Sequence, residues 1–287
     1  MADKPAATPA PDDAAQRDKA RFEELLKTPA ARSSGRVALA SGAALDYAVT
    51  AEFLPVVLGG SEPGAGDPKA AVLTTAYTVT ATTPRPVCFA FNGGPGSASI
   101  WLHLGALGPQ RVVVPDDASM PAAPNSVQEN PHTWLEHFDL VFIDPPHTGW
   151  SLAADAEARK KLLSADGDIA CFSEVIRLWL TRHGRWGSPV YLCGESYGTT
   201  RGAGIANQLH ELGVVVNGAI LVSLAMDLQS IVFAPGNDLP YALFLPAFAN
   251  TSQYHGLLQG PLAESPAAAR EAAEAFVQED YAAALLA

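Results

Sequence analysis

The chain has 287 residues, of which 48% are apolar and 17% charged, a balance that excludes a wholly disordered or fibrous protein. With 18 basic against 30 acidic side chains, its net charge of −12 repels phosphate backbones and anionic lipids, so we expect neither a nucleic-acid nor a membrane partner. The cysteines are few and odd in number, which argues against a disulfide framework. Their apolar neighbours predict buried thiols at Cys88, Cys171 and Cys193.

The N-terminal segment, residues 1–35, is rich in Ala, Pro and Asp, and it is predicted to be mobile apart from a short helix at residues 21–27. It contains no apolar run that could form the core of a signal peptide, and no later run approaches 18 uninterrupted apolar residues. As written, the chain is predicted to be cytoplasmic, while processing of the N-terminus would leave export open.

The segment 36–230 reads as an α/β core. Alternating apolar residues predict a strand at 45–53, and a turn rich in Gly, Pro and Asp leads to a second strand at 71–80, an antiparallel opening. Helices predicted at 168–183 and 199–212 then alternate with short apolar strands, which predicts a mostly parallel sheet covered on both faces. These strands are expected at 87–91, 139–144, 190–193 and 219–224.

Two helix starts can be predicted from their capping residues. Asp166 is expected to cap the helix at 168–183. In the last segment, residues 231–287, Ser265 is a good N-cap and Pro266 suits the first helical position. That last helix meets no stop signal, so we expect a chain that is incomplete at its C-terminus and ends at the start of a helical cap or insertion.

The segment most informative about chemistry is Gly194-Glu195-Ser196-Tyr197-Gly198, which lies between a predicted strand and a predicted helix. G-x-S-x-G in this context is typical of a nucleophile turn, because the sharp bend needs small neighbours and lifts the serine hydroxyl clear of the sheet. The alternative is an ordinary tight turn between a strand and a helix.

A glycine-rich segment, FNGGPGSAS at residues 91–99, follows another predicted strand. Glycines let the backbone come close to a substrate, so N–H groups can point at an oxyanion that forms during acyl transfer. We expect the two donors to be the N–H groups of Gly94 and Tyr197. A phosphate-binding loop is disfavoured, because the P-loop lysine is missing and Ser99 stands where a dinucleotide motif has its third glycine; a plain glycine-rich turn stays an alternative.

Three blocks, NGGPGSAS, NPHTWLEHFDLVFIDPPHTGWS at residues 130–151, and GESYGTTR, resemble the serine carboxypeptidase family in order and spacing, with flanks similar to its bacterial branch. The resemblance implies an α/β-hydrolase fold and removal of C-terminal residues from peptides. It also implies that Ser196 is the nucleophile and that Gly94 and Tyr197 form the oxyanion hole. We expect no cofactor, and the lone pair Asp166 and Asp168 is too sparse for a metal site.

The resemblance further implies how a substrate's terminal carboxylate is bound. In the family, the Asn of NGGPG and the Glu before the nucleophile donate hydrogen bonds to it, and these positions are Asn92 and Glu195 here. A carboxylic acid donates only in its protonated form. The family's second Glu corresponds to Ala106, which weakens the expectation of a paired-acid clamp and leaves Asn92 as the better candidate.

The triad's Asp and His normally lie well beyond the length of this chain. His210 is carried about 20 Å along the helix that follows Ser196, so it cannot be the base. His255, oriented by Asp227, is a weak candidate for the base, and the favoured alternative is that it is a solvated surface histidine. His103 is predicted to be structural. Since losing the base costs about 10⁶ in kcat in a comparable hydrolase, we expect this chain alone to be nearly inactive. An esterase or acyltransferase and a non-catalytic homologue are the alternatives, and the oligomeric state is not indicated.

Overall fold

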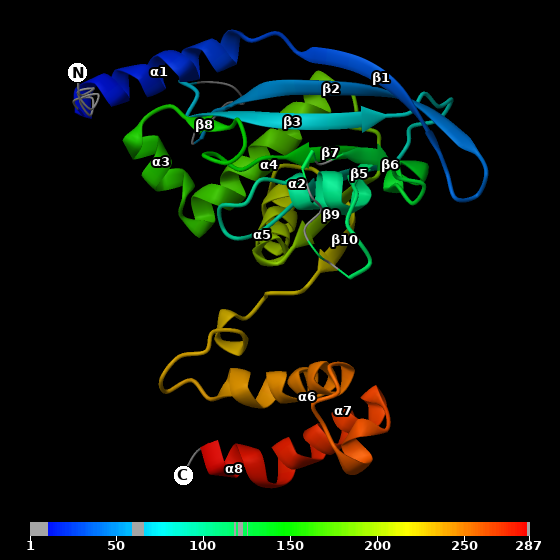
Figure 1. The fold of residues 1–287 in the computed structure, drawn as a ribbon. Coiled ribbons are helices and arrows are strands. Elements are labelled where there is room, and N and C mark those ends of the chain that lie inside the picture. The colour runs from blue at the N-terminus through cyan, green and yellow to red at the C-terminus, as the bar shows by residue number, and fades with distance from the viewer. Residues whose placement is uncertain (1–10, 59–65, 118, 120–122, 125, 286–287) are drawn as a thin grey trace, which may run out of the picture. The chain divides into compact units, whose positions relative to one another are not determined.

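The computed structural model describes residues 11–58, 66–117, 119, 123–124 and 126–285. The chain divides into two compact units, residues 1–224 and 225–287 (Figure 1). The first unit contains the eight-stranded sheet, and the second is built mainly of helices. All residues that the sequence assigns to the nucleophile turn and the glycine-rich loop lie in the first unit.

The sheet is mixed, in the order β1-β2-β3-β7-β4-β9-β10, with β8 paired to β3. Strands β7, β4, β9 and β10 form the expected parallel part, and β1, β2 and β3 extend it by antiparallel pairing. A separate antiparallel pair is formed by β5 and β6. The bounds are β1 Ala31–Ala38, β2 Ala44–Val56, β3 Ala70–Thr78, β4 Val87–Phe91, β5 Gln110–Val112, β6 Val127–Glu129, β7 Asp139–Ile143, β8 Leu152–Ala153, β9 Val190–Glu195 and β10 Val216–Val222.

Both faces of the sheet are covered, as the sequence predicted. Phe89 and Phe91 of β4 pack in one apolar cluster with side chains of α4 (Ala165–Arg182) and α5 (Tyr197–Glu211). Cys88 and Ala90, which alternate with them, face a second cluster that includes Leu102 of the short helix α2 (Ile100–Leu102). Because both faces are covered, all five residues of β4 are buried. The three cysteines are buried and free, which confirms that prediction.

Two predicted helix starts are wrong. Helix α1 covers Pro11–Lys27, so it begins ten residues before the predicted helix. Helix α4 begins at Ala165, and its cap is Ser164, whose hydroxyl accepts a hydrogen bond from Gly167 N at 3.1 Å. Asp166 instead lies in the first turn, where its charge still favours the helix N-terminus. A shorter helix, α3 (Ala156–Leu162), precedes α4.

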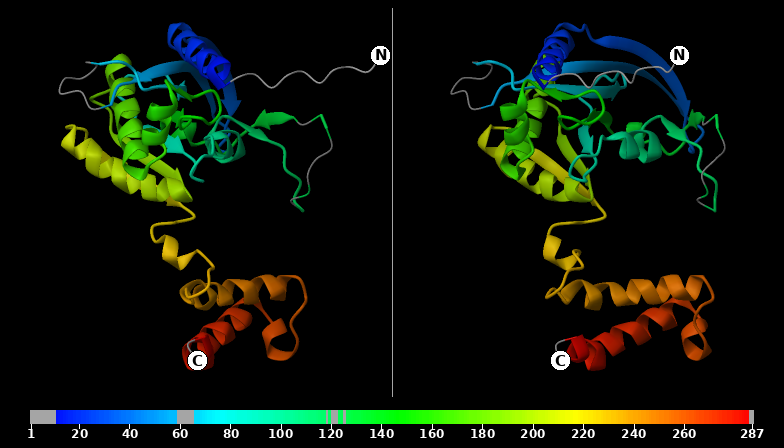
Figure 2. Two further views of the ribbon diagram at one scale, coloured as in Figure 1. Left: turned by 90° about the vertical axis from the view of Figure 1, so that its left-hand side faces the viewer. Right: turned by 60° about the vertical axis from the view of Figure 1, so that its left-hand side comes forward.

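The second unit contains α6 (Leu239–Tyr254), α7 (Pro266–Phe276) and α8 (Ala282–Leu285), and α6 and α7 lie side by side (Figure 2). Ser265 caps α7 by accepting a hydrogen bond from Ala268 N at 3.1 Å, with Pro266 at the first helical position, as predicted. None of the helices in the described ranges combines the length and apolar character that a bilayer-spanning segment needs.

His103 follows α2 and packs into the first unit. Its ring stacks on Phe142 with 4.4 Å between the ring centroids. The Tyr77 hydroxyl and His103 Nε2 form a hydrogen bond of 2.6 Å. Burial disfavours the charged ring and lowers the pKa of His103 to about 4.

These contacts predict a pH-dependent stability. Between pH 6.5 and pH 4 the unfolded chain protonates at residue 103 and the folded chain does not, so the free energy of unfolding falls as the pH is lowered through this window, by about 3 kcal/mol from this group. Urea unfolding at several pH values should show a smaller fall for His103→Gln. His137→Gln is the control, because the His137 side chain is exposed; equal pH slopes for wild type and His103→Gln would contradict the prediction.

Candidate active site

Ser196 stands at the junction of β9 and α5, where the sequence predicts a nucleophile turn. Its backbone has φ 57° and ψ −126°, a left-handed conformation that is uncommon for a residue with a side chain. The turn is tied to the neighbouring strand, since Ser196 N donates to Val222 O of β10 at 2.9 Å. Within the described residues the half-buried Ser196 side chain does not cap α5, so its hydroxyl is not committed to the helix.

The two glycines of G-x-S-x-G are required by crowding. A Cβ atom at Gly194 would lie 2.1 Å from Gly198 O, and one at Gly198 would lie 2.9 Å from Phe91 O. Both contacts are with backbone atoms, which cannot rotate away. The strand, the turn and the helix therefore pack closely at Ser196, as the sequence pattern indicated.

The glycine-rich loop lies directly against this turn through Gly93. A Cβ atom at Gly93 would lie 2.4 Å from Tyr197 N and 2.7 Å from Glu195 O. The next residue, Gly94, has φ 107°, a conformation that favours glycine. The structure thus brings the loop that contains Gly94 together with Tyr197, the two expected oxyanion donors. Gly93 was not among the predicted site residues, although its place in the NGGPG block is the signal for it.

Asn92 and Glu195 are brought together as well. The Asn92 amide donates from Nδ2 to Glu195 Oε2 at 2.9 Å, and its Oδ1 accepts from Leu102 N at 3.0 Å. Asn92 is only 1% exposed, whereas Glu195 is half-buried. The Glu195 carboxylate is therefore the more accessible member of the pair. The Asn92 amide has two N–H donors, and one of them takes no part in these two hydrogen bonds.

A buried arginine that the sequence did not predict lies next to this site. Arg201, on the first turns of α5, donates from Nη1 to the carbonyl oxygen of Asn92 at 2.6 Å and from Nε to Asp168 Oδ2 at 2.7 Å. The Arg201 guanidinium lies over the Tyr197 ring, 5.2 Å from its centroid. The surrounding GESYGTTR block contained the residue, but no local pattern shows that an arginine after a nucleophile turn points inward.

The histidines lie elsewhere. Among the described residues, no hydrogen bond joins the Ser196 hydroxyl to a histidine ring. His210 lies in the last turn of α5, as expected, and His255 caps α6 in the second unit. His147, in the loop after β7, has φ 63° and borders a cavity with residues of α1 and α3; burial, and then Arg159, lower its pKa.

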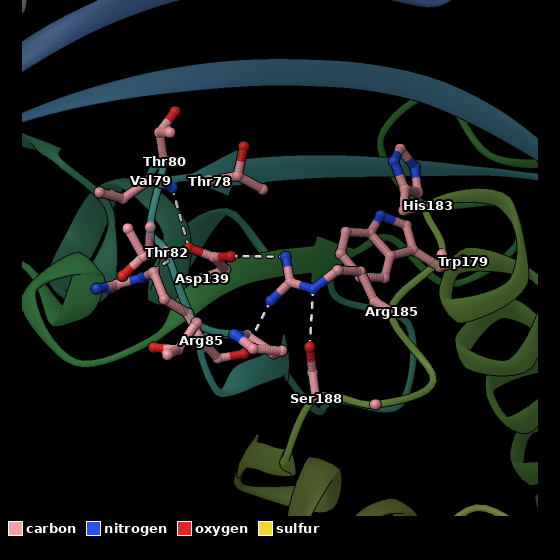
Figure 3. A pocket seen from close by; sticks show the side chains of 15 residues that line it. Thr78, Val79, Thr80, Thr82, Arg85, Asp139, Trp179, His183, Arg185 and Ser188 are labelled. Carbon is pink, nitrogen blue, oxygen red and sulfur yellow. Dashed lines mark hydrogen bonds and ion pairs between the residues drawn. The ribbon is translucent and has the colours of Figure 1, made fainter.

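A second cavity, of about 550 Å³, lies at the amino ends of the parallel strands, opposite the end at which Ser196 stands (Figure 3). Asp139 opens β7 there and accepts hydrogen bonds from Arg85 Nε at 3.0 Å and Arg185 Nη1 at 2.7 Å. Ligands of α/β sheets bind beyond the carboxyl ends of the strands, and both arginines are committed to Asp139, so we assign this cluster a structural and not a ligand-binding role. Ser196, at the carboxyl end of β9, is on the opposite edge.

The sheet order, the helices on its two faces and the strained serine between β9 and α5 define an α/β hydrolase. The family model described as serine carboxypeptidase matches residues 76–222, just over half of the chain. The protein belongs to the serine carboxypeptidase family.

The fold agrees with that of a solved carboxypeptidase. The prohormone-processing carboxypeptidase Kex1Δp of Saccharomyces cerevisiae is similar with 20% sequence identity and a TM-score of 0.54, over 82% of this chain and 49% of that one. The chain thus spans about half the length of that structure. The rice cell wall degrading esterase LipA of Xanthomonas oryzae is more distantly similar, with 14% identity and a TM-score of 0.41 over 88% of this chain and 69% of that one. No curated protein sequence matches in the comparison.

Proposed function

We propose that the protein is a serine-type carboxypeptidase that uses Ser196 to remove C-terminal residues from peptides. The observation that carries the proposal is the strained Ser196 backbone, φ 57°, at a turn where the glycine-rich loop packs against Tyr197. Strain at a non-glycine residue persists only where the surrounding structure enforces it, and it gathers at functional sites. Membership of the serine carboxypeptidase family supports the same reaction.

In the proposed reaction the Ser196 oxygen attacks the carbonyl carbon of the last peptide bond. The negative oxygen that forms is held by the N–H groups of Gly94 and Tyr197, and the C-terminal residue leaves as an amine after it takes up a proton. Water then releases the shortened peptide from Ser196. The proton transfers need a general base, a histidine by the logic of the triad.

Recognition of the free C-terminus is proposed for Asn92 and Glu195. Their hydrogen bond orients the Asn92 amide, and its remaining N–H can donate to a carboxylate. Because two carboxylates repel each other, the role proposed for Glu195 is to orient Asn92. Ala106 supplies no second acid, which makes Asn92 the main donor.

Covalent labelling tests the proposal without requiring turnover. A fluorophosphonate should label Ser196 well above a heat-denatured control, and Ser196→Ala should abolish the adduct in the mass spectrum. A dipeptide with a free C-terminus should protect Ser196 better than the same dipeptide with a C-terminal amide. Asn92→Ala should remove that difference, while Glu211→Ala, an exposed change at the end of α5, should keep it.

Three results would count against the proposal. Labelling no faster than in denatured protein favours a non-catalytic homologue. Labelling with equal protection by the free and the amidated dipeptide favours an esterase or acyltransferase. Protection that survives Asn92→Ala removes Asn92 from carboxylate recognition.

A further inference from the structure

The first unit buries one complete ion pair close to the nucleophile turn. Arg201 is 1% exposed and Asp168 is 7% exposed, and Arg201 Nε lies 2.7 Å from Asp168 Oδ2. Arg201 belongs to α5, and Asp168 belongs to the first turn of α4. Burying such a pair costs desolvation energy, and apolar residues of similar volume often stabilise a fold as well or better. Stability alone is therefore a weak reason for these two residues.

The arginine also reaches the glycine-rich loop. Its Nη1 donates to Asn92 O at 2.6 Å, two residues before Gly94. Lysine could hold the ion pair, but only the planar guanidinium offers separate donors in fixed directions to Asp168 and to the Asn92 carbonyl at once. Arg201 therefore couples the position of the loop to that of α4.

The ion pair of Arg201 and Asp168 also interacts with the Tyr197 side chain. The Arg201 guanidinium lies 5.2 Å from the centroid of the Tyr197 ring and 4.5 Å from that of Phe172, within the range of cation–π attraction. Burial, and then the Asp168 charge, raise the pKa of the Tyr197 hydroxyl, so it stays a hydrogen-bond donor.

We infer that Arg201 and Asp168 are positioning residues that set the distance between the two oxyanion donors, Gly94 N–H on the loop and Tyr197 N–H on α5. The inference rests on the proposed function, because the donors are assigned there. Neither residue touches the reacting atoms. Their effect is expected on the bond-forming step and not on the initial binding of a reagent, since the donors are used only once negative charge develops.

Arg201→Lys is the first test, because it keeps the charge and loses the second hydrogen bond. Fluorophosphonate labelling measured over a range of reagent concentrations should give a kinact about 10- to 100-fold lower, with KI within about twofold of wild type. The matched control is Arg177→Lys: Arg177 forms a two-pronged ion pair with Glu174 on α4 itself, at 2.7 Å. It should leave kinact unchanged. If Arg201→Lys does not fold, the comparison is repeated with Asp168→Asn as the test variant and Glu174→Gln as its control.

A second readout is independent of labelling. Backbone ¹⁵N order parameters of Gly94 and Tyr197 should fall from the rigid range, about 0.85, toward about 0.6 in Arg201→Lys and Asp168→Asn, and stay rigid in the controls. If wild type is not labelled, the proposed function fails, and the order parameters alone decide the inference. Rigid donors in both variants, or a wild-type kinact in a folded Arg201→Lys or Asp168→Asn, would overturn it.

Discussion

Asp139→Ala is expected to lower the free energy of unfolding by about 3–5 kcal/mol, a large part of the stability of a typical domain. Asp139 is almost fully buried, and it is the shared acceptor of Arg85 Nε, Arg185 Nη1 and Val79 N. Removing it leaves two guanidinium groups, each under one fifth exposed, without the carboxylate that compensates their desolvation. Urea unfolding followed by circular dichroism measures the difference.

Asp46→Ala is the matched control for Asp139→Ala. Asp46 also pairs with an arginine, Arg36, at 3.1 Å, but both side chains are largely exposed, at 75% and 66%. Exposed pairs contribute about 0–1 kcal/mol, so this variant should unfold near wild type. Because Asp139 lies at the edge of the sheet opposite Ser196, the folded fraction of Asp139→Ala should be labelled at the wild-type rate. Equal stabilities for the two variants would refute the assigned role of Asp139.

Gly93→Ala should reduce labelling of Ser196 by about 100-fold or more, the cost typical of losing one oxyanion donor. The added methyl group would lie 2.4 Å from Tyr197 N and 2.8 Å from Gly198 N. Neither backbone atom can move without unwinding the start of α5, so the loop with Gly94 must retreat from the turn. We expect a loss of stability of about 1–3 kcal/mol as well, the range for overpacked sites. Labelling rates and urea unfolding test the two parts separately.

Gly105→Ala is the control for Gly93→Ala. It follows the same loop in sequence, and a methyl group there would meet nothing within 4 Å. Its labelling and unfolding should therefore match wild type. If Gly93→Ala labels as fast as Gly105→Ala, the close approach of the loop has no part in the chemistry.

The parts of the fold that could be predicted from sequence are those with strong local signals. VCFAF and the LVFI that follows Asp139 are short continuous apolar runs, and each lies in a fully buried strand because helices or turns cover both faces. The G-x-S-x-G turn was predictable because the tightest part of its steric requirement, that of Gly194 against Gly198 O, acts between residues four apart. The start of α4 was not, since Ser164 and Asp166 are both good caps and only packing decides between them.

The supports of the candidate site could not be predicted, because they depend on contacts between distant segments. Gly93 is required by an approach to Tyr197, about a hundred positions away in the chain, and nothing around Gly93 indicates that neighbour. Asp168 lies in the first turn of α4, as predicted, but nothing in the sequence around it indicates that it pairs with Arg201 on the next helix. Hydrophobic periodicity predicts which apolar residues lie in the core, but it does not predict which charged residues are buried.

The conformation of Ser196 sets a trade-off between folding and chemistry at one residue. A left-handed backbone of this kind costs about 1–3 kcal/mol for any residue with a side chain, and glycine would adopt it at little cost. A threonine hydroxyl would offer similar reactivity, but its branched Cβ is a severe outlier at positive φ. Fold stability alone would thus favour glycine at position 196, and glycine would remove the hydroxyl that the proposed reaction uses.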